Sequence, residues 1–248
     1  MQPMMLITGG SRGIGAATAR LAAARGYRVC ISYRRRRDQA QAVVAELRSA
    51  GAEAWAVQAD VGCEAEVQNL FAELDRLPGE LRVLVNNAGI LESQARLEQI
   101  DAARLERVLR TNVIGSFLCA REAVLRMSTR HGGRGGAIVN LSSGAARLGA
   151  PNEYVDYAAS KGAIDSMTIG LAKEVADEGI RVNGVRPGLI YTEIHADGGE
   201  PGRVDRLKGA VPMQRGGRPE EVAEAVLWLA SDAAAYTTGS FIEVTGGR

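Results

Sequence analysis

The chain has 248 residues, of which 46% are hydrophobic and 24% are charged, and its formal net charge is +1. This composition is typical of a globular protein and lacks the basic surplus of a surface that binds nucleic acid. No apolar run approaches the roughly 18 residues that span a bilayer, and the first ten residues lack the basic region of a signal peptide, so we expect a cytoplasmic protein with neither nucleic acid nor a membrane as its partner.

Short runs rich in Val, Ile and Leu alternate with longer amphipathic segments along the chain. This alternation predicts parallel strands joined by crossover helices. The expected strands are 4–7, 29–31, 54–57, 83–85, 137–139, 180–182 and 241–244. The expected helices are 13–25, 38–50, 65–77, 97–130, 157–177 and 219–229. The fold class is therefore α/β, with a parallel sheet covered by helices on both faces, and a single domain over residues 1–248 is the favoured organisation.

A glycine-rich segment, TGGSRGIG at 8–15, follows the first expected strand and leads into a helix. Glycines in such a turn let backbone N–H groups approach a pyrophosphate, and the N-terminus of the helix favours its negative charge. Structural turns use glycine as well, but the strand before this segment and the helix after it favour a nucleotide site. The candidate cofactor contacts in the segment are Gly9, Ser11, Arg12, Gly13, Ile14 and Gly15.

The loop after the second expected strand distinguishes the two nicotinamide cofactors. A carboxylate there would bind the ribose diol of NAD, but this chain has Tyr33 followed by four arginines. Arginine suits a phosphate monoester, and Arg12 could reach the same group. A solvated helix start is the alternative interpretation of the run. We expect NADP(H) in preference to NAD(H), with Tyr33, Arg34 and Arg35 among its contacts.

Two further polar segments follow expected strands. Asp60 and Val61 come after the third strand, and Asn87, Ala88 and Gly89 come after the fourth. An N-cap and a turn are the structural alternatives for these segments. Because the carboxyl ends of parallel strands meet at one edge of the sheet, we expect both segments to lie beside the glycine-rich segment.

Tyr157 and Lys161 are four residues apart in an expected helix, which places their side chains on one face. A nearby ammonium group favours the phenolate and should lower the pKa of the tyrosine toward neutrality. Such a pair alone is often structural. Ser142 and Ser143, at the end of the fifth expected strand, strengthen the interpretation of a catalytic site.

With these motifs in the same order, the chain resembles the short-chain dehydrogenase/reductase family over nearly its whole length, and in particular 3-oxoacyl-carrier-protein reductases and glucose-dehydrogenase-like oxidoreductases. The resemblance also covers Asn112, Pro187, Gly188 and the glycines at 239, 246 and 247. It implies a seven-stranded, doubly wound Rossmann-type sheet with strand order 3-2-1-4-5-6-7. It further implies hydride transfer between the nicotinamide of NADP(H) and a carbonyl or secondary alcohol.

The resemblance also implies roles for individual residues. Tyr157 would be the general acid or base, and Lys161 would hold the nicotinamide ribose and lower the pKa of Tyr157. Ser143 would bind the substrate carbonyl in preference to Ser142, and Asn112 would support a water chain to Lys161. After the sixth strand, Pro187 and Gly188 form a turn, and the family uses the backbone near Ile190 and the hydroxyl near Thr192 to orient the carboxamide.

Some questions stay open at the level of sequence. A catalytically inactive NADP(H)-binding regulator on the same fold is the alternative function. The family implies a homotetramer, and 190–217 suggests a substrate lid without a clear element after residue 198. Glu153 and His195 could contact a polar substrate, although a solvated Glu and a surface His are the commoner cases. Three unpaired cysteines and two histidines offer little for a metal site, and we expect none.

Overall fold

The computed structural model describes residues 2–248, and all seven of its strands belong to one parallel sheet. The strands are β1 (Met4–Ile7), β2 (Arg28–Tyr33), β3 (Ala54–Gln58), β4 (Leu81–Asn86), β5 (Gly136–Leu141), β6 (Ile180–Pro187) and β7 (Phe241–Val244). Their order is β3-β2-β1-β4-β5-β6-β7, so the expected α/β fold and the strand order that the resemblance implied are confirmed. The direction of winding reverses between β1 and β4, which is where open sheets of this kind bind their ligands.

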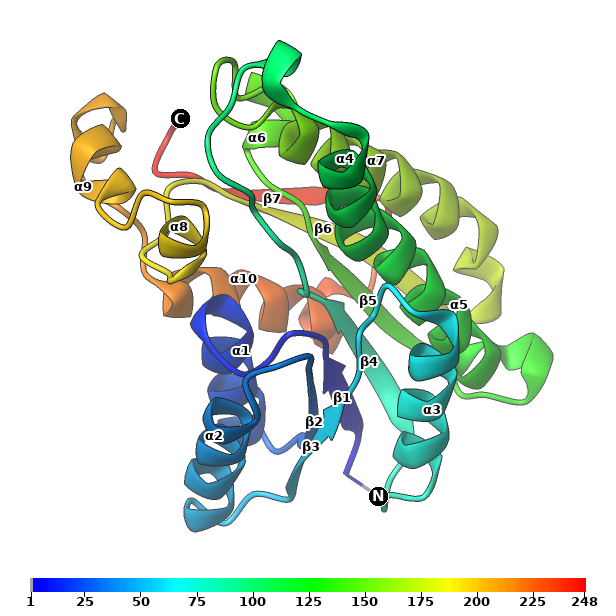
Figure 1. Ribbon diagram of the computed structural model, residues 1–248. Coiled ribbons are helices and arrows are strands. Elements are labelled where there is room, and N and C mark those ends of the chain that lie inside the picture. The colour runs from blue at the N-terminus through cyan, green and yellow to red at the C-terminus, as the bar shows by residue number, and fades with distance from the viewer. Residues whose placement is uncertain (1) are drawn as a thin grey trace.

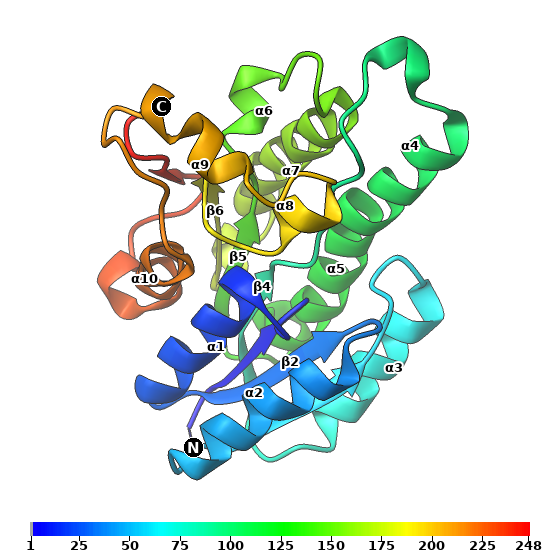
Figure 2. The same ribbon diagram turned by 60° about the vertical axis from the view of Figure 1, so that its left-hand side comes forward.

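Helices cover both faces of the sheet (Figures 1 and 2). One face packs against α1 (Gly13–Ala24), α2 (Arg37–Ser49) and α10 (Pro219–Ala230), and the other against α3 (Glu64–Asp75), α5 (Gly115–Met127) and α7 (Val155–Glu174). Each face has its own buried apolar cluster, and Ile7 lies in one while the neighbouring Leu6 lies in the other. This arrangement follows from the alternation of side chains along each strand. Among the described residues, no helix is both long and apolar enough to cross a membrane.

The expected helix over 97–130 is wrong as a single element. The segment contains η1 (Leu97–Gln99), α4 (Ala102–Leu109), a π-helical turn η2 (Arg110–Ile114), α5 and η3 (Thr129–His131). Asp101 starts α4 as an N-cap, because its carboxylate accepts a hydrogen bond from the Arg104 N–H at 2.7 Å. Gly115 follows the π turn and packs so closely that an added Cβ would lie 2.7 Å from Val61. The π turn contains Asn112, and such turns often occur at functional sites.

The segment after β6 also differs from the expectation. The sequence pattern predicts no clear element beyond residue 198, but α9 (Arg203–Leu207) and η5 (Lys208–Ala210) lie there, after α8 (Ile194–Asp197). These pieces are too short to show a helical period in the sequence. In Figures 1 and 2, α8 and α9 lie over the carboxyl ends of the strands, and α6 (Ala145–Leu148) lies at the same end of the sheet.

Candidate functional site

One large pocket, with a volume of about 870 Å³, opens at the carboxyl ends of the strands. The structure brings all but two of the candidate residues to its wall, and the two exceptions are Gly15 and Asn112. From the cofactor set the wall contains Gly9, Ser11, Arg12, Gly13, Ile14, Tyr33, Arg34, Arg35, Asp60, Val61, Asn87, Ala88, Gly89, Pro187, Gly188, Ile190 and Thr192, and from the catalytic set Ser143, Tyr157 and Lys161. Loops from both halves of the sheet therefore contribute to a single cavity.

The loop between β1 and α1 has the shape of a phosphate cradle. Gly9 and Gly13 have positive φ angles of 65° and 52°, which favour glycine. A Cβ on Gly15 would lie 2.5 Å from the Gly9 carbonyl oxygen, so the close packing of helix on loop requires glycine there too. The side chain of Arg12, the N-cap residue of α1, forms no capping hydrogen bond. The free N–H groups of α1 and the bare loop fit the pyrophosphate of a dinucleotide.

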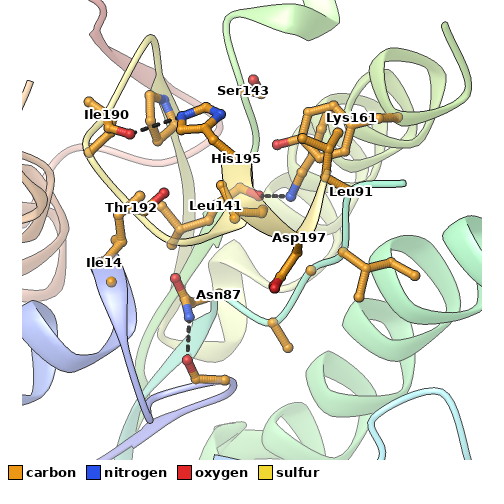
Figure 3. A pocket seen from close by; sticks show the side chains of 18 of the residues that line it. Ile14, Asn87, Leu91, Leu141, Ser143, Lys161, Ile190, Thr192, His195 and Asp197 are labelled. Carbon is orange, nitrogen blue, oxygen red and sulfur yellow. Dashed lines mark hydrogen bonds between the residues drawn. The ribbon is translucent and has the colours of Figure 1, made fainter. Parts of the chain in front are cut away.

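Some candidate residues build the cradle through contacts with their neighbours in the protein. The Asn87 side-chain amide donates to the carbonyl oxygens of Thr8 at 2.8 Å and Gly9 at 3.0 Å, as Figure 3 shows in part. The Asp60 carboxylate accepts from the Gly62 N–H at 3.0 Å, in the turn that follows β3. Asp60 is therefore not the N-cap of α3, which is Cys63, and both Asp60 and Asn87 bond neighbouring backbone while they line the pocket wall.

Four arginines surround the part of the pocket next to β2, and two of them contact the segment after β6. Arg34 pairs with Asp60 at 2.7 Å. Arg12 and Arg36 both pair with the Asp197 carboxylate, the latter at 3.4 Å. Arg35 forms no ion pair among residues 2–248. Figure 3 shows Asp197 pointing into the pocket. Asp197 was not expected here, because 185 residues separate it from Arg12 in the sequence.

The start of α7 places Tyr157 and Lys161 on the opposite side of the pocket. The Lys161 Nζ donates to the Leu141 carbonyl oxygen at 2.7 Å and lies 5.6 Å from the centre of the Tyr157 ring. The two serines that follow β5 have different environments. Ser142 is buried and donates to the Lys161 carbonyl oxygen at 3.2 Å, whereas the Ser143 hydroxyl lies near enough to Tyr157 to favour the charged form of the phenol. Of the two hydroxyls, Ser143 thus has the one beside the phenol.

Burial controls the charge of both α7 side chains. It raises the pKa of Tyr157, and the nearby Ser143 hydroxyl only partly opposes this shift. Burial lowers the pKa of Lys161 to about 8, although Asp165 favours its charge. The expected lowering of the Tyr157 pKa by Lys161 is therefore wrong for the protein alone, because the cost of burying a phenolate is the larger effect.

The lowered pKa of Lys161 should appear in the pH dependence of stability. Between about pH 8 and pH 10.5, the ordinary pKa of lysine, Lys161 keeps its proton in the unfolded chain but has released it in the folded chain, so stability rises with pH. From about pH 7 to about pH 9.5 we expect the free energy of unfolding of the wild type to rise by about 1–2 kcal/mol relative to that of Lys161→Met. Urea unfolding of both proteins measures this difference. A constant difference across the range would contradict the lowered pKa.

Asn112 lies behind the pocket wall rather than in it. Its Nδ2 donates to the Ile90 carbonyl oxygen and to the Ser160 Oγ, both at 3.1 Å, and its Oδ1 accepts from the Ile90 N–H at 2.8 Å. A Cβ on Gly89 would lie 3.5 Å from the Asn112 Oδ1 and 3.6 Å from the Lys161 Nζ. Both polar atoms therefore face the same small space beside Gly89, and the Oδ1 keeps a second lone pair for a further donor.

Three large buried side chains with polar groups also line the pocket, and of these only His195 was named from the sequence, as a possible contact for a polar substrate. Tyr154, His195 and Arg203 are no more than 9% exposed. The surface position that was the commoner expectation for His195 is wrong, because α8 folds this residue inward. A helix of four residues leaves no period in the sequence from which this inward position could be read.

Comparisons with known proteins find relatives that match nearly the whole chain. A family model described as enoyl-(acyl carrier protein) reductase matches residues 9–248. An uncharacterized oxidoreductase of Escherichia coli K12, YgfF, is 59% identical, with 98% of each chain covered. The 3-oxoacyl-acyl-carrier-protein reductase FabG of Staphylococcus aureus Mu50 is 36% identical over 100% of this chain and 98% of its own. A solved short-chain dehydrogenase/reductase of Serratia marcescens is 34% identical, with a TM-score of 0.90 over 99% of this chain and 97% of its own.

Proposed function

Because the chain belongs to the short-chain dehydrogenase/reductase family, we propose that it transfers a hydride between NADP(H) and a small-molecule carbonyl or secondary alcohol. Members of this family are oxidoreductases that act on such groups, and they use a nicotinamide cofactor. One observation carries the proposal for this chain. Ser143, Tyr157 and Lys161 line the same pocket as a glycine-rich phosphate cradle.

Tyr157 is the proposed general acid for reduction and the general base for oxidation. Its hydroxyl gives a proton to the substrate oxygen in one direction and takes it back in the other. Ser143 donates a hydrogen bond to the same oxygen as negative charge develops on it. The cofactor, when bound, supplies or accepts the hydride.

Lys161 is proposed to hold the ribose hydroxyls of the nicotinamide nucleoside. Its charge would favour the Tyr157 phenolate against the larger cost of burying that group. Asn112 is proposed to hold a water between its Oδ1 and the Lys161 Nζ, which would connect Lys161 with solvent. Ile190 and Thr192 are proposed to orient the carboxamide. An added Cβ on Gly13 would lie 3.3 Å from the Thr192 side chain, and this closeness to the cradle supports the proposal.

A comparison of the two serines tests the role of Ser143. We expect Ser143→Ala to lower kcat by roughly 10²-fold, because one donor to the developing oxyanion is lost. Ser142→Ala removes a hydroxyl that bonds the backbone of α7, so its kcat should change by less than about tenfold. Steady-state kinetics of both variants measure the difference. A larger loss for Ser142→Ala would reverse the assignment.

The proposed lid and the proposed assembly have different supports. Residues 190–217 supply Ile190, Thr192 and His195 to the pocket wall, which favours a lid that closes on the substrate. A homotetramer is proposed because the α4–α5 region and α7 expose large apolar side chains, among them Leu109, Phe117 and Ile169. A monomer in light scattering would contradict this assembly.

A cytoplasmic location is supported by three free cysteines.

Turnover of NADPH with a broad set of aldehydes and ketones tests the proposed function. Loss of the NADPH absorbance with at least one carbonyl compound is the expected result. Tight binding of NADPH without turnover of any compound would instead indicate the inactive regulator.

A further inference from the structure

One part of the pocket wall, formed by residues after β6 and before α7, has polar groups that the proposed proton transfer does not use. These are His195 in α8 and Arg203 in α9, with Glu153 and Tyr154 from the segment before α7. His195 is 9% exposed and Arg203 is 8% exposed. Each has a buried nitrogen with no hydrogen-bond partner among residues 2–248, namely the His195 Nδ1 and one terminal nitrogen of Arg203. Polar atoms buried in this way usually have a partner.

The contacts of His195 fix the chemistry of its free nitrogen. The Nε2 lies 3.0 Å from the Ile190 carbonyl oxygen, which can only accept a hydrogen bond, so the Nε2 holds the proton. In the neutral ring the Nδ1 is then an acceptor. Burial lowers the pKa of His195, and the nearby charge of Arg203 acts in the same direction, so the ring is neutral at pH 7. Figure 3 shows the ring bound to Ile190 through one nitrogen, with the other on the side toward Ser143.

Arg203 presents the complementary chemistry. One terminal nitrogen donates to the Glu153 carboxylate at 2.5 Å, and the guanidinium lies 4.9 Å from the centre of the Tyr154 ring. The other terminal nitrogen is 3.6 Å from a Glu200 oxygen and forms no hydrogen bond among the described residues. Glu153, the Tyr154 ring and the Glu200 carboxylate therefore hold the guanidinium, and one terminal nitrogen is left without a hydrogen bond among the described residues.

We propose that the His195 Nδ1 and the free N–H of Arg203 form a subsite for hydroxyl groups, and that the substrates are hydroxylated aldehydes or ketones. This inference rests on the proposed function and names its substrate class. A hydroxyl both donates and accepts, so it can satisfy either group. A carboxylate has no proton for the Nδ1, and an alkyl chain leaves both groups without a partner, which a site with buried polar atoms discriminates against.

Matched substrates with and without hydroxyls test the subsite. Dihydroxyacetone and erythrulose are compared with acetone and butanone, with pyruvate as the carboxylate probe. We expect the kcat/KM of the wild type to be at least about tenfold higher for the hydroxylated member of each pair. In His195→Phe this ratio should fall about tenfold, because activity on the hydroxylated compounds falls further than activity on acetone and butanone. Comparing the ratio between the two proteins cancels the intrinsic reactivity of each carbonyl.

Nitrogen NMR provides a readout that needs no turnover. The chain has two histidines, so His195→Phe assigns the His195 signals directly. In Tyr157→Phe protein that contains labelled histidine and NADP⁺, erythrulose should shift the signal of the unprotonated Nδ1, whereas butanone should leave it in place. The same NMR spectra also show that the Tyr157→Phe protein is folded.

The outcomes separate the subsite from the proposed function. The subsite is overturned if the wild type reduces butanone or pyruvate as well as erythrulose, if His195→Phe loses activity on both members of a pair equally, or if the Nδ1 signal does not respond. A wild type that reduces no carbonyl compound at all contradicts the proposed function instead.

Discussion

Replacing Tyr157 with Phe should lower kcat by roughly 10³-fold or more, because positioned acids and bases typically contribute 10²–10⁴-fold and the phenol is the only proposed proton donor to the substrate. NADPH affinity should stay within about twofold, because the ring remains and the phosphate cradle is unchanged. Initial rates and fluorescence titration with NADPH measure the two quantities.

Tyr236→Phe is the matched control for this substitution. Tyr236 is fully exposed and lies outside the pocket wall, so its variant should keep the activity of the wild type. A Tyr157→Phe protein with more than about a tenth of the wild-type kcat would remove Tyr157 from the mechanism.

The kcat/KM for NADPH should exceed that for NADH by roughly 10²-fold or more, because each charge-assisted hydrogen bond from Arg to a phosphate contributes about 1.5–3 kcal/mol. Arg12, Arg35 and Arg36 line the pocket and lie within the region next to β2. Replacing any one of them with Ala should lower the preference for NADPH by about tenfold and change NADH kinetics little. Arg37→Ala is the matched control, because Arg37 belongs to the same run but not to the pocket wall.

Asp197 allows a second test of the preference for NADPH, through a substitution that should increase this preference. Its carboxylate now pairs with Arg12 and Arg36, so a phosphate that binds these arginines has to compete with it. Asp197→Asn should therefore strengthen NADPH binding more than NADH binding, which calorimetric titration measures. If the wild type uses NADH as well as NADPH, the assignment of the arginines to a phosphate is wrong.

The strands and the strand-end motifs could be predicted because their signals are local. Each strand is an apolar run, and the run from Met4 to Ile7 is fully buried as expected. The ends of parallel strands meet at one edge of the sheet, so the order of the motifs alone places Asn87 beside Gly9. The position of Tyr157 and Lys161 on one face of a helix could also be predicted, since four residues make about one helical turn.

The rest could not be predicted because it depends on contacts between distant segments or on burial. The N-cap at Asp101 and the π-helical turn at Arg110–Ile114 divide an apparently continuous helical pattern. The inward position of His195 and the pairing of Asp197 depend on how the segment after β6 folds back. The rise in the Tyr157 pKa reflects the depth of the pocket, which spacing along the chain does not encode.

Transfer of deuterium from NADPH labelled at C4 of the nicotinamide tests the central claim most directly. With a carbonyl compound that the wild type reduces, we expect deuterium from one face of the ring on the new carbinol carbon of the product. The Tyr157→Phe enzyme should form this labelled alcohol roughly 10³-fold more slowly. Mass spectrometry of the alcohol detects the deuterium. An alcohol product without deuterium from either labelled face, or no alcohol from any carbonyl compound while NADPH binds, would contradict hydride transfer by this protein.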